Sequence, residues 1–243
     1  KAWIGAEGRG WGGDVFGCCE KLKCLVLEEG MRHVPDKLAY GCAGLERVEL
    51  PETLESAGRN PWEGTPFLKG WLRGLKLPEK GTVSGLEGGI FWDGRGLGGS
   101  VCLPEQVRIV AGGAFYGNVE LTEVILPESV RFVGAAAFKG CRELRRVLMP
   151  SGIRRLEAEV FAGCGALEEV LLIQEAEASG SDVDLESATE RQNSESATER
   201  QIPGNFGAVF PVWRALGDRA FYRCGRLRRI RLDRVESVGK EAL

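Results

Sequence analysis

The sequence has little of what catalysis and membrane insertion usually require. Its 243 residues include one histidine and two methionines, so at most one imidazole is available as a general base. The longest apolar runs are only a few residues long, as in 170–173, and no transmembrane helix fits them. There is no C-x-x-C spacing of the kind that typically holds zinc. We therefore expect no catalytic residues, no cofactor and no metal site.

Glycine, by contrast, is abundant. It supplies 35 residues, which is about twice its average usage. Apolar residues make up 43% and charged residues 28%, a composition typical of a chain that folds around a core. The net charge of -3 argues weakly against nucleic-acid or membrane-surface binding by the whole chain. So much glycine with this much apolar content predicts many tight turns between short buried segments.

A repeat of about 23 residues organises the chain. The pattern Phe138-x-x-Cys141-x-x-Leu144 recurs 23 residues later at Phe161, Cys164 and Leu167. Further copies begin at Phe16, Phe115 and Phe221, a degenerate copy at Ala39, and looser copies at Phe67 and Phe91. Each Phe closes a six-residue block, and nine such blocks start at Trp11, Val34, Trp62, Leu86, Val110, Val133, Leu156, Leu216 and Val238.

A strand pattern, L-x-x-V-x-L-P, follows the leucine of each copy, as in the segment 121–127. Alternation of apolar and polar residues predicts a short half-buried strand, and proline ends it because proline cannot donate to a ladder. The same pattern predicts a strand over 72–77. The expected leucine column is Leu22, Leu45, Leu72, Leu97, Leu121, Leu144, Leu167 and Leu227.

One coil of this length cannot bury its own apolar face, whereas stacked coils bury a continuous core. The repeat therefore predicts a curved solenoid, mainly β, with one short parallel strand per coil and about eight coils. We expect one domain over residues 1–243, interrupted by an insert at about 174–212. Because the chain starts at Lys1 and near a partial coil, we expect a fragment whose uncapped ends allow oligomers.

These residues resemble the BspA-like class of bacterial leucine-rich repeats, whose pattern is close to I-G-x-x-A-F-x-x-C-x-x-L-x-x-I-x-L-P. Residues 110–172 match it nearly position by position, 11–109 more loosely, and 216–243 again. The resemblance implies a leucine-rich-repeat solenoid of the α/β-type horseshoe class with little helix. It also implies a non-enzymatic bacterial protein, secreted or on the cell surface, that acts in adhesion and binds a protein partner, such as a host or matrix protein.

Five of the eight cysteines share one repeat position, which points inward in a solenoid. These are Cys19, Cys42, Cys141, Cys164 and Cys224. Buried thiols behave there as small hydrophobes, and Asn118 at the same position is expected to bond turn backbone. A disulfide between adjacent coils would also need suitable Cβ geometry. The single histidine, His33, is expected at a solvated surface position.

The insert 174–212 contains the segment E-S-A-T-E-R-Q twice and has eight acidic residues against two arginines. Its polar, acidic composition is typical of a loop that leaves the solenoid. One interpretation is a short tandem duplication without function, and the other is an arm that contacts a partner.

The outward column of the strands offers an apolar row of four residues, which would mark a partner site on the concave strand face. The row is Cys102, Ile125, Leu148 and Leu171, with flanking charges at Glu123, Arg145, Arg146, Glu168 and Glu169. Such residues also simply suit strands, so this alternative stays open.

The last coil is rich in arginine, with Arg228, Arg229 and Arg231 at strand positions. These arginines would bind a polyanion, either a glycan or nucleic acid, or would pair with the acidic insert. Binding of nucleic acid is the less favoured of the partner classes, and a protein partner on the strand face is the leading prediction.

Overall fold

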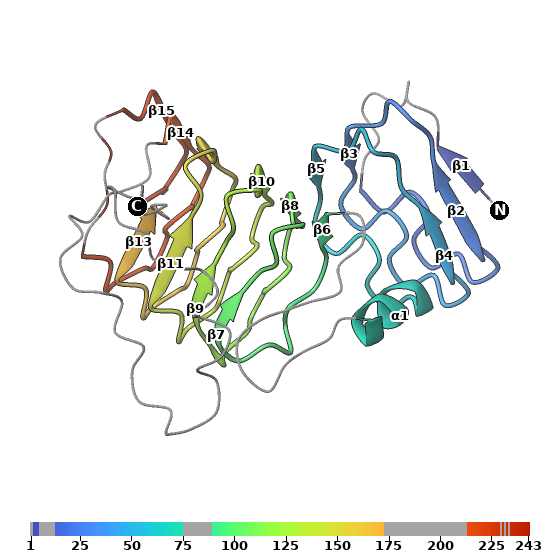
Figure 1. Ribbon diagram of the computed structural model, residues 1–243, viewed down its shortest axis with the longest axis horizontal. Coiled ribbons are helices and arrows are strands. Elements are labelled where there is room, and N and C mark those ends of the chain that lie inside the picture. The colour runs from blue at the N-terminus through green and yellow to red at the C-terminus, as the bar shows by residue number, and fades with distance from the viewer. Residues whose placement is uncertain are drawn as a thin grey trace, which may run out of the picture. The chain divides into compact units, whose positions relative to one another are not determined.

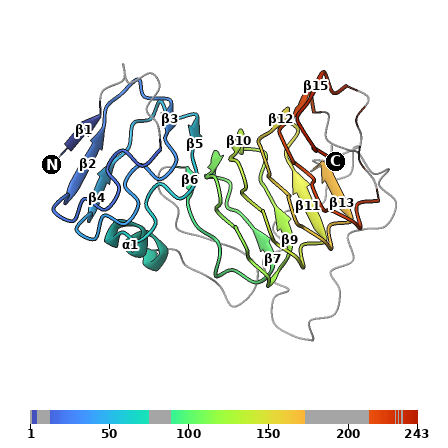
Figure 2. The same ribbon diagram turned by 180° about the vertical axis from the view of Figure 1, so that it is seen from behind.

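The computed structural model describes residues 2–4, 13–74, 89–172, 213–228, 230, 232 and 234–243. These residues belong to one compact unit, a parallel β-solenoid of about seven turns with one helix. Most turns carry one longer strand and one two-residue strand, and Figures 1 and 2 show the two kinds along separate edges of the stack. The solenoid is confirmed, with about seven turns where about eight were expected. The insert 174–212 lies outside the described residues.

The longer strands form two parallel sheets. The first contains β1 (Ala2–Ile4), β2 (Cys24–Leu27) and β4 (Arg47–Glu49) in that order. The second has the order β13-β11-β9-β7, from β7 (Gly99–Cys102), β9 (Leu121–Ile125), β11 (Arg146–Met149) and β13 (Glu169–Leu172). Parallel pairing in one register places the same repeat position of successive turns side by side.

The two-residue strands pair in the same parallel way. They are β3 (His33–Val34), β5 (Ser56–Ala57), β6 (Ile90–Phe91), β8 (Ile109–Val110), β10 (Phe132–Val133), β12 (Arg155–Leu156), β14 (Ala215–Leu216) and β15 (Ser237–Val238). β3 pairs with β5, β6 and β10 both pair with β8, and β14 lies between β12 and β15.

A ladder of aromatic rings runs through the core, as the spacing of phenylalanines predicts. Its members are Phe91, Phe115, Phe138, Phe161 and Phe221. Neighbouring ring centroids lie 5.1 to 5.4 Å apart, and every ring is almost fully buried. The leucine column is also confirmed at its central members, because Leu45, Leu121, Leu144 and Leu167 have no exposed surface.

The third turn departs from the predicted register. Its six-residue block was expected to begin at Trp62, but the block begins at β5 and ends at Trp62. Trp62 thus takes the ring position, which is the position that the ladder phenylalanines take at the end of the block in other turns. The backbone shows this, because Ala39 donates to the carbonyl of Pro61 (2.9 Å) just as Phe115 donates to that of Ala137 (2.7 Å). Phe67 therefore does not occupy a ring position.

A helix covers residues 72–74, where the sequence predicted the start of a strand over 72–77, and residues 75–77 lie outside the described part of the chain. α1 (Pro66–Gly74) begins after Thr65, whose hydroxyl accepts from the N–H of Leu68 (3.2 Å) as an N-cap. Proline at the first helical position has no N–H to leave unpaired. Trp71 packs edge-on against Phe91 (5.7 Å), while Leu72 lies on the exposed side of the helix. Leu72 is therefore not a member of the leucine column.

The fourth turn is shortened. Phe91 pairs with Val110, so it opens the block instead of closing it, and Gly94 takes the ring position. A Cβ on Gly94 would lie 2.3 Å from a ring atom of Phe115, so only glycine at this position leaves room for the ring of Phe115. Leu97, expected in the leucine column, instead takes the cysteine position.

The cysteine column is buried at its central members, Cys42, Cys141 and Cys164, whereas Cys224 is half-buried and Cys19 is exposed. The thiols of Cys141 and Cys164 each donate to the carbonyl of the ring residue one turn earlier, at 3.0 Å. Burial raises the pKa of Cys224 to about 12. All eight cysteines are free thiols. The inward thiols thus donate hydrogen bonds to backbone carbonyls of the neighbouring turn. Asn118 does the same, as predicted, because its side-chain amide donates to the carbonyl of Gly94 (2.9 Å).

Candidate protein-binding face

The outward side of the sheet β7-β9-β11-β13, here called the strand face, carries the predicted apolar row. Cys102 lies opposite Ile125, Ile125 opposite Leu148, and Leu148 opposite Leu171. All four side chains are half-buried rather than fully exposed. Because neighbouring strands are about 4.8 Å apart, the four residues form a row roughly 15 Å long. The structure therefore brings together the four residues that the sequence placed in one column.

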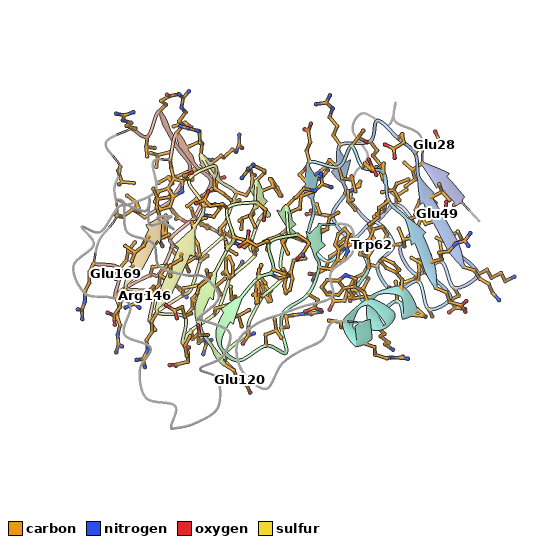
Figure 3. All side chains as sticks on the ribbon, viewed as in Figure 1. Glu28, Glu49, Trp62, Glu120, Arg146 and Glu169 are labelled. Carbon is orange, nitrogen blue, oxygen red and sulfur yellow. The ribbon has the colours of Figure 1, made fainter. Side chains whose placement is uncertain are left out.

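A second row, two residues earlier on each strand, is polar. Ser100 Oγ donates to Glu123 Oε2 (2.9 Å), and Arg146 Nη1 lies 3.4 Å from Glu123 Oε1. Arg146 Nε also lies 3.9 Å from Glu169 Oε2, and Figure 3 shows these two side chains on neighbouring strands. The charges expected to face a partner thus already bind one another across the strands, at a contribution of about 0–1 kcal/mol per exposed pair.

The remaining predicted charges lie beside this row. Arg145 is exposed, and Glu168 Oε2 lies 3.9 Å from Arg228 Nη1. Arg228, one of the three arginines predicted to bind a polyanion, therefore faces a carboxylate of the preceding turn. Arg229 and Arg231 lie outside the described residues, as does the acidic insert with which they were expected to pair.

The thiol of Cys102 is the one nucleophile in the apolar row. Burial raises its pKa, and the negative charge of Glu105 raises it further. A raised pKa keeps the thiol protonated at neutral pH, and the thiolate is the reactive form. Cys102 therefore serves in this face as an apolar side chain and not as an activated nucleophile.

His33 is exposed, as predicted, and its Nδ1 lies 2.7 Å from Ser56 Oγ. Partial burial lowers its pKa, against the opposing influence of Asp36 and Glu157. In the part of the chain that the structure describes, no three His, Cys, Asp or Glu side chains come together as a metal site. No helix there is long and apolar enough to cross a membrane.

The cross-strand ion pairs are a feature that we did not predict from the sequence. Their signal is present, because Glu123, Arg146 and Glu169 stand 23 residues apart and alternate in sign. Reading charges down each repeat column, instead of along each strand, would have found them.

The sequence model described as BspA type leucine rich repeat region matches residues 10–71 and 98–183, with six copies of the repeat. No curated protein matches the sequence.

Among solved structures, a T. pallidum leucine-rich repeat protein is 21% identical, with 70% of this chain and 68% of that chain covered and a TM-score of 0.31. A leucine rich cell surface protein from Faecalibacterium prausnitzii is 16% identical, with coverages of 68% and 63% and a TM-score of 0.30. The pneumococcal vaccine antigen PcpA is 12% identical, with coverages of 63% and 51% and a TM-score of 0.35. This chain thus spans between about half and two thirds of the length of these proteins.

Proposed function

This chain belongs to the BspA-type leucine-rich repeat family, and we propose that it is a non-enzymatic adhesion or interaction protein that binds a protein partner on its strand face. Solenoids present extended surfaces built from equivalent positions of successive repeats, and these surfaces commonly bind macromolecules. On the family resemblance, the proposed location is the surface or exterior of a bacterial cell.

The observation that carries the proposal is the apolar row of Cys102, Ile125, Leu148 and Leu171. The four apolar side chains lie in register and form a continuous strip on the outward face of the sheet. Successive side chains of a strand point to opposite faces, and the outward face ordinarily carries polar groups. Half-burial leaves part of each side chain open to a partner. Covering such a strip removes apolar surface from water, at about 25 cal/mol per Å².

The polar row beside the strip suits the rim of an interface. Protein interfaces typically combine an apolar centre with a polar, solvent-accessible rim. Because Arg146 is shared between Glu123 and Glu169, it compensates one of the two carboxylates and leaves one net negative charge on the rim. The proposed partner surface is therefore apolar at its centre and slightly positive at its rim.

The test is a binding measurement on the double variant Ile125→Asp plus Leu148→Asp. We expect the affinity for those extracellular matrix and serum proteins that bind the wild type to fall roughly 30-fold or more, because two carboxylates would be buried at the centre of the interface. Surface plasmon resonance against an immobilised panel measures this loss, and circular dichroism confirms the fold.

The matched control is Val26→Asp, which makes a similar change at the equivalent, half-buried position of β2 in the other sheet. We expect its affinity to stay within about twofold of the wild type. If the folded double variant binds as the wild type does, the apolar row only reflects the preference of strands for such residues.

A further inference from the structure

Charged side chains of neighbouring turns generally alternate in sign along this solenoid. Arg32 pairs with Glu55 (2.8 Å), and Arg219 pairs with Glu241 (2.6 Å). Further pairs between turns are Asp36–Arg59, Lys139–Glu159, Glu123–Arg146, Arg146–Glu169 and Glu168–Arg228. Alternation is expected from physics, because like charges directly opposite each other on adjacent strands are destabilising.

Several columns depart from this rule, among them Glu105 and Glu128, and one of these columns we call the arginine row: Arg108, Arg131, Arg154 and Arg214. Each precedes a short strand, β8, β10, β12 or β14, and each is exposed. The N–H of Arg131 donates to the carbonyl of Arg108 (2.8 Å), and that of Arg214 to the carbonyl of Arg154 (2.7 Å). Four successive turns therefore carry the same charge at the same position.

The two ends of this column return to alternation. Before the row, Arg32 faces Glu55 and the next turn carries the uncharged Gly89, whose carbonyl accepts from the N–H of Arg108 (2.7 Å); after the row, Arg214 Nε lies 3.9 Å from Glu236 Oε1. Between them, Arg108, Arg131 and Arg154 form no ion pair with any described residue. The like-charged stretch is thus confined to adjacent turns within a column that is otherwise balanced.

The acidic residues nearest in sequence, Glu105 and Glu128, stand three residues before Arg108 and Arg131 and form no ion pair with the row. Arg131 Nη1 donates to the carbonyls of Val130 (3.4 Å) and Glu128, which leaves the positive charge uncompensated. The neighbouring Arg155 is bound to Glu157 (3.0 Å). Arg108 and Glu52 line one hollow but form no ion pair. A ligand with negative charges in a line would supply the missing partner.

We propose that the arginine row binds a linear anionic polysaccharide through its sulfate or carboxylate groups. The guanidinium fork matches such oxygens with two parallel hydrogen bonds. At about 4.8 Å per turn, the row spans about 15 Å, which suits a chain lying across the turns rather than a single ion.

The surroundings favour a polysaccharide over single-stranded nucleic acid, which typically needs exposed aromatic rings for base stacking. The aromatic residue beside the row, Phe132, is only partly exposed and packs against the apolar cluster that contains Ile109. This site lies at the short strands and is separate from the strand face (Figure 1), so it stands or falls independently of the proposed protein partner.

The test measures heparin binding by the full chain at several salt concentrations, with the triple variant Arg108→Gln, Arg131→Gln, Arg154→Gln. We expect the wild type to bind, with an affinity that falls steeply as salt rises, and the variant to bind roughly 30-fold or more weakly with a reduced salt slope. The matched control is Arg142→Gln, Arg226→Gln, Arg234→Gln, which removes three exposed arginines outside the row and is expected to bind within about threefold of the wild type.

The proposal would be overturned if the wild type did not bind heparin at physiological salt, or if the two triple variants lost heparin affinity equally. It would also be overturned if the wild type bound polyuridylic acid as tightly as heparin and the arginine-row variant abolished that binding. The last of these results would assign the row to nucleic acid instead.

A second variant separates a ligand-binding role from a structural one. Arg154→Glu restores alternation between Arg131 and Arg214, so we expect heparin binding to be lost while the Tm rises by roughly 1–3 °C. The control is Arg142→Glu, because Arg142 forms no ion pair with a described residue. We expect this control to leave both heparin binding and the Tm unchanged. A fall in the Tm of Arg154→Glu would show that the row stabilises the fold, against the proposal.

Discussion

Truncating Phe138 to alanine is expected to lower the free energy of unfolding by about 4 kcal/mol. Phe138 is the middle ring of the aromatic ladder, stacked between Phe115 (5.1 Å) and Phe161 (5.4 Å), and it has no exposed surface. Its removal opens a cavity that the two flanking rings cannot fill, because each is held by its own turn. Chemical denaturation followed by circular dichroism measures the loss.

The control for this prediction is Tyr116→Ala, which deletes an aromatic side chain of similar size that is 51% exposed. We expect the control to change stability by less than about 1 kcal/mol. Equal effects of the two substitutions would show that the ring ladder does not hold the turns together.

Asn118→Ala is expected to lower the free energy of unfolding by about 3–4 kcal/mol. The side-chain amide donates to the carbonyls of Gly94 (2.9 Å) and Leu97 (2.6 Å). Its oxygen accepts from the N–H groups of Glu120 (3.0 Å) and Leu121 (3.1 Å). Alanine leaves these backbone groups without their partner in a buried place, and each such loss costs about 1 kcal/mol.

Asn118→Cys is the informative comparison, because cysteine is the residue that other turns carry at this position. A thiol regains the bond to the carbonyl one turn earlier, as Cys141 does, but not the other three. We therefore expect a stability between those of Asn118→Ala and the wild type. A wild-type stability for Asn118→Ala would contradict the account of this column.

The sequence was sufficient for those parts of the fold that depend on strict periodicity. Phe115, Phe138 and Phe161 stand 23 residues apart. Because turns of equal length stack on one another, each ring lies directly between the rings of the two neighbouring turns. The third and fourth turns could not be derived in this way. Phe67 closes a six-residue block that starts at Trp62 and therefore matches the sequence pattern of a ladder phenylalanine. The backbone hydrogen bonds between turns show that Trp62, and not Phe67, takes that position.

The helix α1 shows how a local signal can outweigh a repeat. The pattern from Leu72 onward matches the strand consensus, yet Thr65 caps a helix that begins at Pro66, six residues earlier. Side-chain pairing between turns at the candidate site was also missed, because its signal lies down the repeat columns and not along each strand. Arg146 binds Glu123 and Glu169 only because strand register brings residues 23 apart into contact.

The most direct test of a partner on the strand face is the alkylation rate of Cys102 with and without bound partner. Cys102 is a free thiol within the apolar row, and exposed Cys19 is an internal reference outside it. Because burial raises the pKa of Cys102, the reaction is run at about pH 8.5, where enough thiolate forms. With saturating partner, we predict that alkylation of Cys102 slows tenfold or more while Cys19 reacts as before. Unchanged alkylation of Cys102 in the saturated complex would contradict binding at this face.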